Sequence, residues 1–136
     1  MSKPIAASHI RLKRAYDPPT ADDGYRILID RLWPRGVRKA DAAIDQWAKD
    51  LAPSTELRLW FGHDPASWEE FRRRYAQELA LQKEAIQALR EQARNDPITL
   101  VYAAKDERCN NAVALRDFLL GRLAGAARVS LLHKAG

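Results

Sequence analysis

The chain has 136 residues, of which 46% are apolar and 30% are charged, with a formal net charge of +5. This balance is typical of a folded globular protein and excludes a disordered one. The length suits one domain, which we expect over residues 1–136 with its core between about residues 9 and 133. The single cysteine, Cys109, excludes an intrachain disulfide scaffold. No run approaches the roughly 18 apolar residues of a membrane span, and the start lacks the apolar segment of a secretory signal. We therefore expect a cytoplasmic protein without membrane contact.

The first half of the chain predicts three strands. Ile10–Arg14 alternates apolar and basic residues, a pattern typical of a strand with one face in water. A turn rich in Pro and Asp follows at residues 17–24. Residues 25–30 then have the apolar character of a central strand that is buried on both faces. Pro34 lies in the next segment and favours a loop there, and residues 44–48 are predicted as a further short strand.

Capping residues and apolar periodicity predict three helices. The first begins with Ser54 as its cap. The second begins at Ser67 and Glu70, which have capping-box spacing. Its apolar residues recur three and four apart as far as about residue 94, and only Gln82 interrupts them. The third helix is expected over residues 112–123.

Two more strands are predicted in the second half of the chain, at residues 98–104 and 128–132. Strands that alternate with helices indicate an α/β fold. We therefore predict a small, mostly parallel sheet of five short strands, flanked by helices in a single domain.

Two of the apolar strands end in charged residues. Asp30 and Arg31 end the strand at residues 25–30, and Lys105 and Asp106 follow the strand at residues 98–104. In open α/β sheets, ligands bind outside the carboxyl ends of the strands. A charge just beyond a buried strand also needs a close partner, a ligand or solvent access. The pattern therefore leaves two interpretations open: a ligand site, or an internal Asp–Arg network that fastens the loops.

An anion is the ligand that these residue types favour. Arginine is well suited to bidentate capture of phosphate or carboxylate, and the N–H groups at a helix start also attract anions. We predict a cleft at the strand carboxyl ends for a small ligand that bears a phosphate or carboxylate, a nucleotide included. The expected ligand-binding residues are Arg31, Trp33, Arg35, Ser54, Tyr102, Lys105 and Asn110.

Three residues are candidates for acid–base chemistry: Asp30, His63 and Asp106. His63 stands beside Asp64, and a His next to a carboxylate can carry protons. Asp64 before Pro65 also favours a helix cap, and we prefer this role for Asp64. The role of His63 stays open. The pattern does not decide whether the protein is an enzyme.

Simpler roles remain open for several of these residues. Helix capping alone accounts for Ser54 and Asn110, and core packing accounts for Trp33 and Tyr102. The sequence has no His or Cys spacing of a zinc site, and it has no Walker loop or nucleophile elbow. No cofactor is therefore indicated.

The basic balance leaves two other functions open. One is a nucleic-acid-binding or regulatory protein, and the other is a stress-related interaction protein without a ligand. The run of three arginines at residues 72–74 argues little for nucleic acid, because Glu69 and Glu70 precede Arg73 and Arg74 by four residues and favour helix ion pairs. The basic residues that motivate the nucleic-acid alternative are Arg11, Lys13, Arg14, Arg38 and Lys39.

Three motifs carry a family resemblance. They are Asp-Gly-Tyr-Arg-Ile-Leu-Ile-Asp-Arg-Leu-Trp-Pro-Arg-Gly from Asp23, Trp-Phe-Gly-His-Asp-Pro from Trp60 and Leu-Val-Tyr-Ala-Ala-Lys-Asp from Leu100. The chain resembles the YeaO-like family of conserved bacterial proteins of unknown function, from about residue 10 to about residue 120. The resemblance implies a small α/β domain and no particular reaction. Broader relatives have a Cys-His-Arg-like element after the later strand, and the sequence departs from them with Cys109-Asn110-Asn111.

Overall fold

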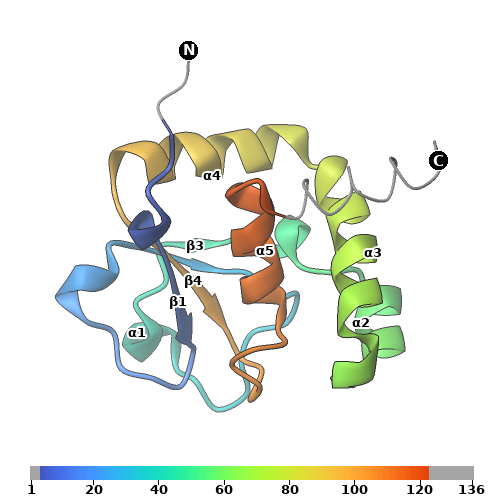
Figure 1. Ribbon diagram of the computed structural model, residues 1–136. Coiled ribbons are helices and arrows are strands. Elements are labelled where there is room, and N and C mark those ends of the chain that lie inside the picture. Colours follow the sequence, from blue (N-terminus) through green and yellow to red (C-terminus); the bar gives the residue numbers. More distant parts are fainter. Residues whose placement is uncertain (1–3, 123–136) are drawn as a thin grey trace.

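The computed structural model describes residues 4–122, in which four parallel strands form one sheet. The strands are β1 (Ile10–Arg14), β2 (Tyr25–Leu28), β3 (Gln46–Trp47) and β4 (Ile98–Tyr102). Their order is β1-β4-β2-β3, so β4 lies between β1 and β2 and pairs with both (Figure 1). The α/β class is confirmed, and the strand predicted at residues 128–132 lies outside the described residues.

Helices supply most of the rest of the described chain. The α-helices are α1 (Lys39–Ala42), α2 (Thr55–Phe61), α3 (Trp68–Ala80), α4 (Lys83–Asn95) and α5 (Asn111–Leu119). Short 3-10 turns precede several elements: η1 (Ala7–His9), η2 (Ala21–Asp23), η3 (Lys49–Leu51) and η4 (Pro65–Ser67). Figure 1 shows α5 in front of β4, with α2 and α3 lying together beside the sheet.

The two faces of the sheet are covered unequally. Alternate side chains of a strand point to opposite faces, so Ile27 and Leu100 enter the main core with apolar residues of α2, α3, α4 and α5. Leu28 and Val101 enter a much smaller cluster on the other face, with residues from the segment between β2 and β3. Helices α2 to α5 therefore form one thick layer, and the loop-rich segment that contains α1 covers the opposite face.

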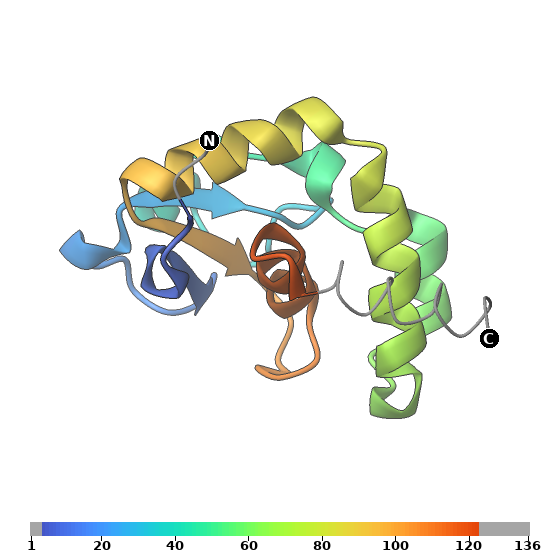
Figure 2. The same cartoon turned by 45° about the horizontal axis from the view of Figure 1, so that its top comes forward.

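The long helix predicted from residue 67 to about residue 94 is wrong as a single element. The structure has α3 and α4 instead, separated at Leu81 and Gln82, where Gln82 has φ −100° and ψ 51°. A straight helix of that length would extend about 40 Å, more than twice the roughly 17 Å of a five-residue strand. The break lets α4 return across the layer, as Figure 2 shows. The polar Gln82 was the sequence signal of this break.

The predicted capping residues have mixed outcomes. Ser54 caps α2 by accepting a hydrogen bond from the Leu57 N–H, and Asp64 caps η4 by accepting from the Ala66 N–H. Ser67 makes no side-chain cap, so the capping box with Glu70 is wrong. Its physical reason is that Glu70 instead pairs with two arginines of α3. The last helix begins at Asn111, one residue before the expected start, and ends at Leu119.

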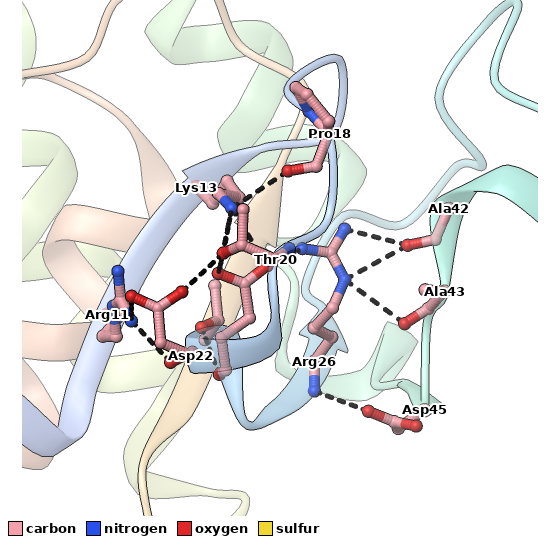
Figure 3. A network of polar contacts seen from close by, with 11 residues as sticks. Arg11, Lys13, Pro18, Thr20, Asp22, Arg26, Ala42, Ala43 and Asp45 are labelled. Carbon is pink, nitrogen blue, oxygen red and sulfur yellow. Dashed lines mark hydrogen bonds and ion pairs between the residues drawn. The ribbon is translucent and has the colours of Figure 1, made fainter.

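Figure 3 shows a polar network that includes Lys13, Thr20 and Arg26. The buried carboxylate of Asp23 ties the strands together within this network. It accepts hydrogen bonds from the ammonium group of Lys13 on β1 and from the guanidinium group of Arg26 on β2. Its backbone carbonyl accepts from the hydroxyl of Thr99 on β4. Burial alone would raise the pKa of Asp23, but hydrogen bonds from Lys13, Thr20 and Arg26 outweigh it and hold that pKa well below its usual range. This network is structural, and it leaves the opposite, carboxyl edge of the sheet open.

Candidate functional site

A cavity of about 380 Å³ opens at the carboxyl ends of β2 and β4. Its volume falls within the range of small-molecule sites, about 300–1,000 Å³. Because β2 and β4 are parallel neighbours, the segments that follow them meet at this edge. The cavity is lined by Asp30, Arg31, Leu32, Trp33, Pro34, Arg35, Ala52, Pro53, Arg58, Phe61, His63, Phe71, Ala103, Ala104, Asn110 and Asn111.

Asp30 joins three elements in the cavity wall. One carboxylate oxygen accepts a hydrogen bond of 2.9 Å from the backbone N–H of Ala103, just beyond β4. The other accepts one of 2.9 Å from the side-chain amide of Asn111, which begins α5 and also donates to the carbonyl of Ile29. Burial raises the pKa of Asp30, against the lowering effect of these two hydrogen bonds. The two hydrogen bonds therefore hold the carboxylate in one orientation, in an environment that is partly shielded from solvent.

Three arginines line the same cavity. Arg31 is half-buried and donates to the carbonyls of Ala52 and Pro53 across distances of 3.3 and 3.4 Å, near the outer limit for a hydrogen bond. Arg35 and Arg58 are exposed. Within residues 4–122, none of the three forms an ion pair. The cavity therefore collects cationic charge that the described residues do not neutralise by direct pairing.

The arginines of α3 behave differently. Arg72 pairs with Glu69, and Arg73 and Arg74 both pair with Glu70. The prediction of a partly neutralised helix face is confirmed, although Glu69 pairs three residues ahead and not four. The arginines of α3 are therefore paired with acids of their own helix, whereas the described residues give the cavity arginines no such partner.

His63 lies at the cavity in an uncommon backbone conformation. It has φ 57° and follows Gly62, which has φ 54° and ends α2. Left-handed conformations of non-glycine residues are uncommon and are concentrated at functional sites. The ring centroid of His63 is 6.0 Å from that of Phe61, which stacks on Phe71 at 4.4 Å. These aromatic rings give the cavity an apolar wall beside its cations.

Several predicted site residues do line the cavity, but with additional roles. Trp33 donates its indole N–H to the carbonyl of Val37 and packs edge-on against Trp47. Asn110 is buried and caps α5 by accepting from the Val113 N–H. Trp33 therefore has the expected packing role and Asn110 the expected capping role, and both residues also line the cavity. The predicted residues that the structure brings together are Asp30, Arg31, Trp33, Arg35, His63 and Asn110.

Four other predicted residues do not line this cavity: Ser54, Tyr102, Lys105 and Asp106. The Ser54 hydroxyl donates to Glu78 on α3 while it caps α2. Tyr102 is 3% exposed and belongs to the main core. Lys105 is exposed to solvent.

Asp106 shapes a turn instead of reaching the cavity. One of its carboxylate oxygens accepts from the backbone N–H groups of Arg108 and Cys109, at 2.8 and 3.0 Å. The hydrogen bonds from Cys109 and Arg108 lower the pKa of Asp106. A carboxylate bound in this way suits loop closure more than proton transfer.

Arg58 and Asn111 line the cavity but were not among the predicted site residues. Arg58 stands three residues before Phe61 on α2, so both side chains share one side of that helix. That spacing was the available signal. Asn111 follows the predicted cap Asn110, and its role depends on the approach of β2 to the start of α5.

The basic residues that motivated nucleic-acid binding are engaged within the chain. Arg11 pairs with Asp22, Lys13 with Asp23 and Arg38 with Asp41. Arg14 donates to the carbonyl of Ala104, and Lys39 lies over the ring of Trp33. These contacts do not add support for a nucleic-acid surface.

Two further kinds of feature are absent from residues 4–122. That part of the chain has no helix with both the length and the apolar character needed to cross a membrane. It also has no group of three or more His, Cys, Asp or Glu side chains placed to hold a metal ion.

The parallel sheet, its helical layer and the cavity at its carboxyl edge define a small α/β protein with a ligand-sized cleft. The chain belongs to the DUF488-N3i family, described as the inactive DUF488-N3 subclade, whose model matches residues 9–131. This membership and the relatives below confirm the resemblance to YeaO-like proteins.

Two relatives match this chain over almost their whole length. It is 46% identical over 111 residues to the uncharacterized protein YeaO of Escherichia coli (strain K12). The matched region covers 82% of this chain and 96% of YeaO. It is 38% identical over 118 residues to the uncharacterized protein Rv3073c of Mycobacterium tuberculosis (strain ATCC 25618 / H37Rv), covering 87% of this chain and 99% of Rv3073c. No solved structure shows significant similarity to the chain.

Proposed function

We propose that this chain is a ligand-binding protein whose cleft holds a small anion bearing a phosphate or a carboxylate. One observation carries the proposal: Arg31, Arg35 and Arg58 line a single cavity, and the described residues give none of them an ion-pair partner. The place of the cavity, at the carboxyl ends of parallel strands, is where α/β sheets generally bind ligands. The description of the family as an inactive subclade supports binding without turnover.

The energetics favour an anion over a neutral guest. A hydrogen bond that involves a charged group contributes about 1.5–3 kcal/mol, more than a neutral one. Arg31 would lose little on turning to a ligand, because its present contacts with two carbonyls are long. Arg35 and Arg58 are exposed at the cavity, so they can adjust to the anion without disturbing the core.

The apolar wall suits the carbon part of such a ligand. Phe61 and Phe71 are stacked and line the cavity, as does Trp33. Aromatic faces pack well on flat rings. A mononucleotide is the largest ligand that we include in this class.

Calorimetric titration and thermal shift test the proposal with inorganic phosphate, succinate and adenosine monophosphate as probes. We expect at least one probe to raise the melting temperature of the wild type, with a smaller rise in Arg31→Ala and Arg58→Ala. Arg73→Ala is the matched control, because it removes the same charge from α3 without touching the cavity. Equal shifts in all four proteins would contradict the proposal.

A further inference from the structure

Asp30 is an acidic residue in a cavity that three arginines also line. Of the described residues, one donor reaches each of its carboxylate oxygens: the Ala103 N–H and the Asn111 amide. A carboxylate offers about four acceptor positions. Both fixed donors belong to the protein framework, so they orient the group and leave acceptor capacity on a residue that lines the cavity.

The neighbouring cations do not use that capacity. Within residues 4–122, Asp30 forms no ion pair, and the adjacent Arg31 is turned to the carbonyls of Ala52 and Pro53. Burial raises the pKa of Asp30 although Arg58 and His63 act on it electrostatically in the opposite sense without a direct contact, as expected for a carboxylate that is only partly compensated. An internal Asp–Arg network therefore does not explain why an acid stands here.

A role in fastening the loops explains only part of the arrangement. Holding the Ala103 N–H and the Asn111 amide requires two acceptors, and Asp30 provides both. It does not require that the acid line a ligand-sized cavity beside three arginines. A carboxylate in that position repels a purely anionic guest and attracts one that also carries a donor.

We propose that the cleft selects a bifunctional ligand, in which Asp30 accepts a hydrogen bond from a hydroxyl or amino group while the arginines hold the anionic group. This inference rests on the proposed function and adds the second half of the recognition. Ligands of this class include hydroxy acids, amino acids and phosphorylated polyols.

Two matched pairs of compounds test the inference by calorimetry on the full chain. Glycerol 3-phosphate has two hydroxyl groups that n-propyl phosphate lacks, and malate has one hydroxyl group that succinate lacks. We expect the wild type to bind the hydroxylated member of at least one pair about tenfold more tightly or better, since one hydrogen bond to a charged acceptor is lost in the other member. This comparison needs no variant, so it does not depend on the folding of a mutant.

Asp30→Asn then assigns the preference to this side chain. We expect its preference within the same pair to fall to about twofold or less, while the affinity for the member without hydroxyl groups stays the same or increases. Arg58→Ala is the companion variant, and we expect it to weaken both members equally.

The outcomes separate the two proposals. If the wild type binds both members of each pair equally, the inference is overturned and the anion site stands. The same holds if Asp30→Asn folds and keeps the full preference. If none of the four compounds binds, the inference is overturned as stated. The anion site is then judged by inorganic phosphate and adenosine monophosphate, and it is overturned as well if neither of them binds.

Discussion

Asp23 and Arg26 form an ion pair of 2.6 Å in which the two side chains are 1% and 4% exposed. The guanidinium group also donates to the carbonyls that end α1, and Lys13 approaches the same carboxylate from β1. Two cations thus depend on one buried acid, and the segments that carry them are held in place by it.

Asp23→Asn removes that acid and leaves Lys13 and Arg26 without their counter-charge. We expect a loss of about 3–5 kcal/mol in the free energy of unfolding at pH 7, measured by urea denaturation, because breaking a buried pair leaves an uncompensated charge. Asp22→Asn is the control, since Asp22 is 72% exposed and pairs with Arg11 at the surface. It is expected to leave the free energy of unfolding nearly unchanged, because an exposed ion pair contributes little.

The same variant has a defined pH dependence. The pKa of Asp23 is lowered by its partners from an ordinary 3.8, so its contribution is complete above that value and is lost as the pH falls through the native pKa. The stability difference between the wild type and Asp23→Asn is therefore expected to shrink below pH 3.8. A difference that stays constant down to acid unfolding would contradict the assignment.

Gly24 and Gly36 provide a matched test of a close backbone approach. Both have positive φ, 65° and 79°, but a Cβ at Gly24 would stand 2.3 Å from the carbonyl oxygen of Pro97, whereas nothing lies within 4 Å at Gly36. Gly36→Ala is expected to cost about 1–2 kcal/mol from backbone strain alone. Gly24→Ala adds a steric overlap and is expected to cost about 1–3 kcal/mol more. Similar melting temperatures for the two variants would count against this contact.

Tyr75 gives a further prediction, on a buried hydroxyl. Its ring is fully buried, and its hydroxyl donates to the carbonyl of Leu51. Tyr75→Phe leaves that carbonyl without this donor and is expected to cost about 1–3 kcal/mol. Tyr16→Phe is the counterpart, because the Tyr16 hydroxyl donates to the Arg35 carbonyl at the exposed surface. Its expected cost is within about 0.5 kcal/mol. Chemical denaturation of both variants compares the two sites directly.

Asp30 predicts a pH effect of opposite sign. Burial raises the pKa of Asp30 above 3.8, so the native state binds a proton more readily than the unfolded state. The free energy of unfolding therefore falls as the pH rises from the ordinary pKa to the raised native pKa. The free energy of unfolding of the wild type, relative to that of Asp30→Asn, is expected to decrease from pH 3.8 upward until the native pKa is passed. An increase over that interval would show that Asp30 is stabilised as an anion.

Local sequence patterns predicted the strands better than the helices. The alternation in Ile10–Arg14 gave the bounds of β1, and the apolar run from Ile98 gave the start of β4. The polar Gln82 marked the position of the break, but apolar spacing continues across it and favoured one helix. Only the size of the sheet makes one straight helix unfavourable. The bounds of β1 and the start of β4 were therefore predictable from the residues of each strand alone, whereas the separation of α3 from α4 also depends on the size of the sheet.

The candidate site was predictable to a similar extent. The carboxyl ends of parallel strands locate Asp30 and Arg31, since this depends only on strand direction. Lys105 and Asp106 follow β4 in the same way, yet the turn after that strand places them outside the cavity wall. The spacing of Arg58 and Phe61 places both on one side of α2, but that this side faces the cavity depends on the packing of α2 beside the strand ends, which is a long-range relationship.

The position of β4 has a consequence for how the chain is made. β1 and β2 follow each other in sequence but do not pair, because β4 lies between them. Every contact of β4 with them closes a long loop, which makes sheet formation a late and slow step. β2 can pair earlier with β3, but during synthesis β1 has no partner strand until Ile98–Tyr102 has left the ribosome. A nascent chain that stops before Ile98 therefore has no strand to join its first two, and it remains exposed to proteases and chaperones.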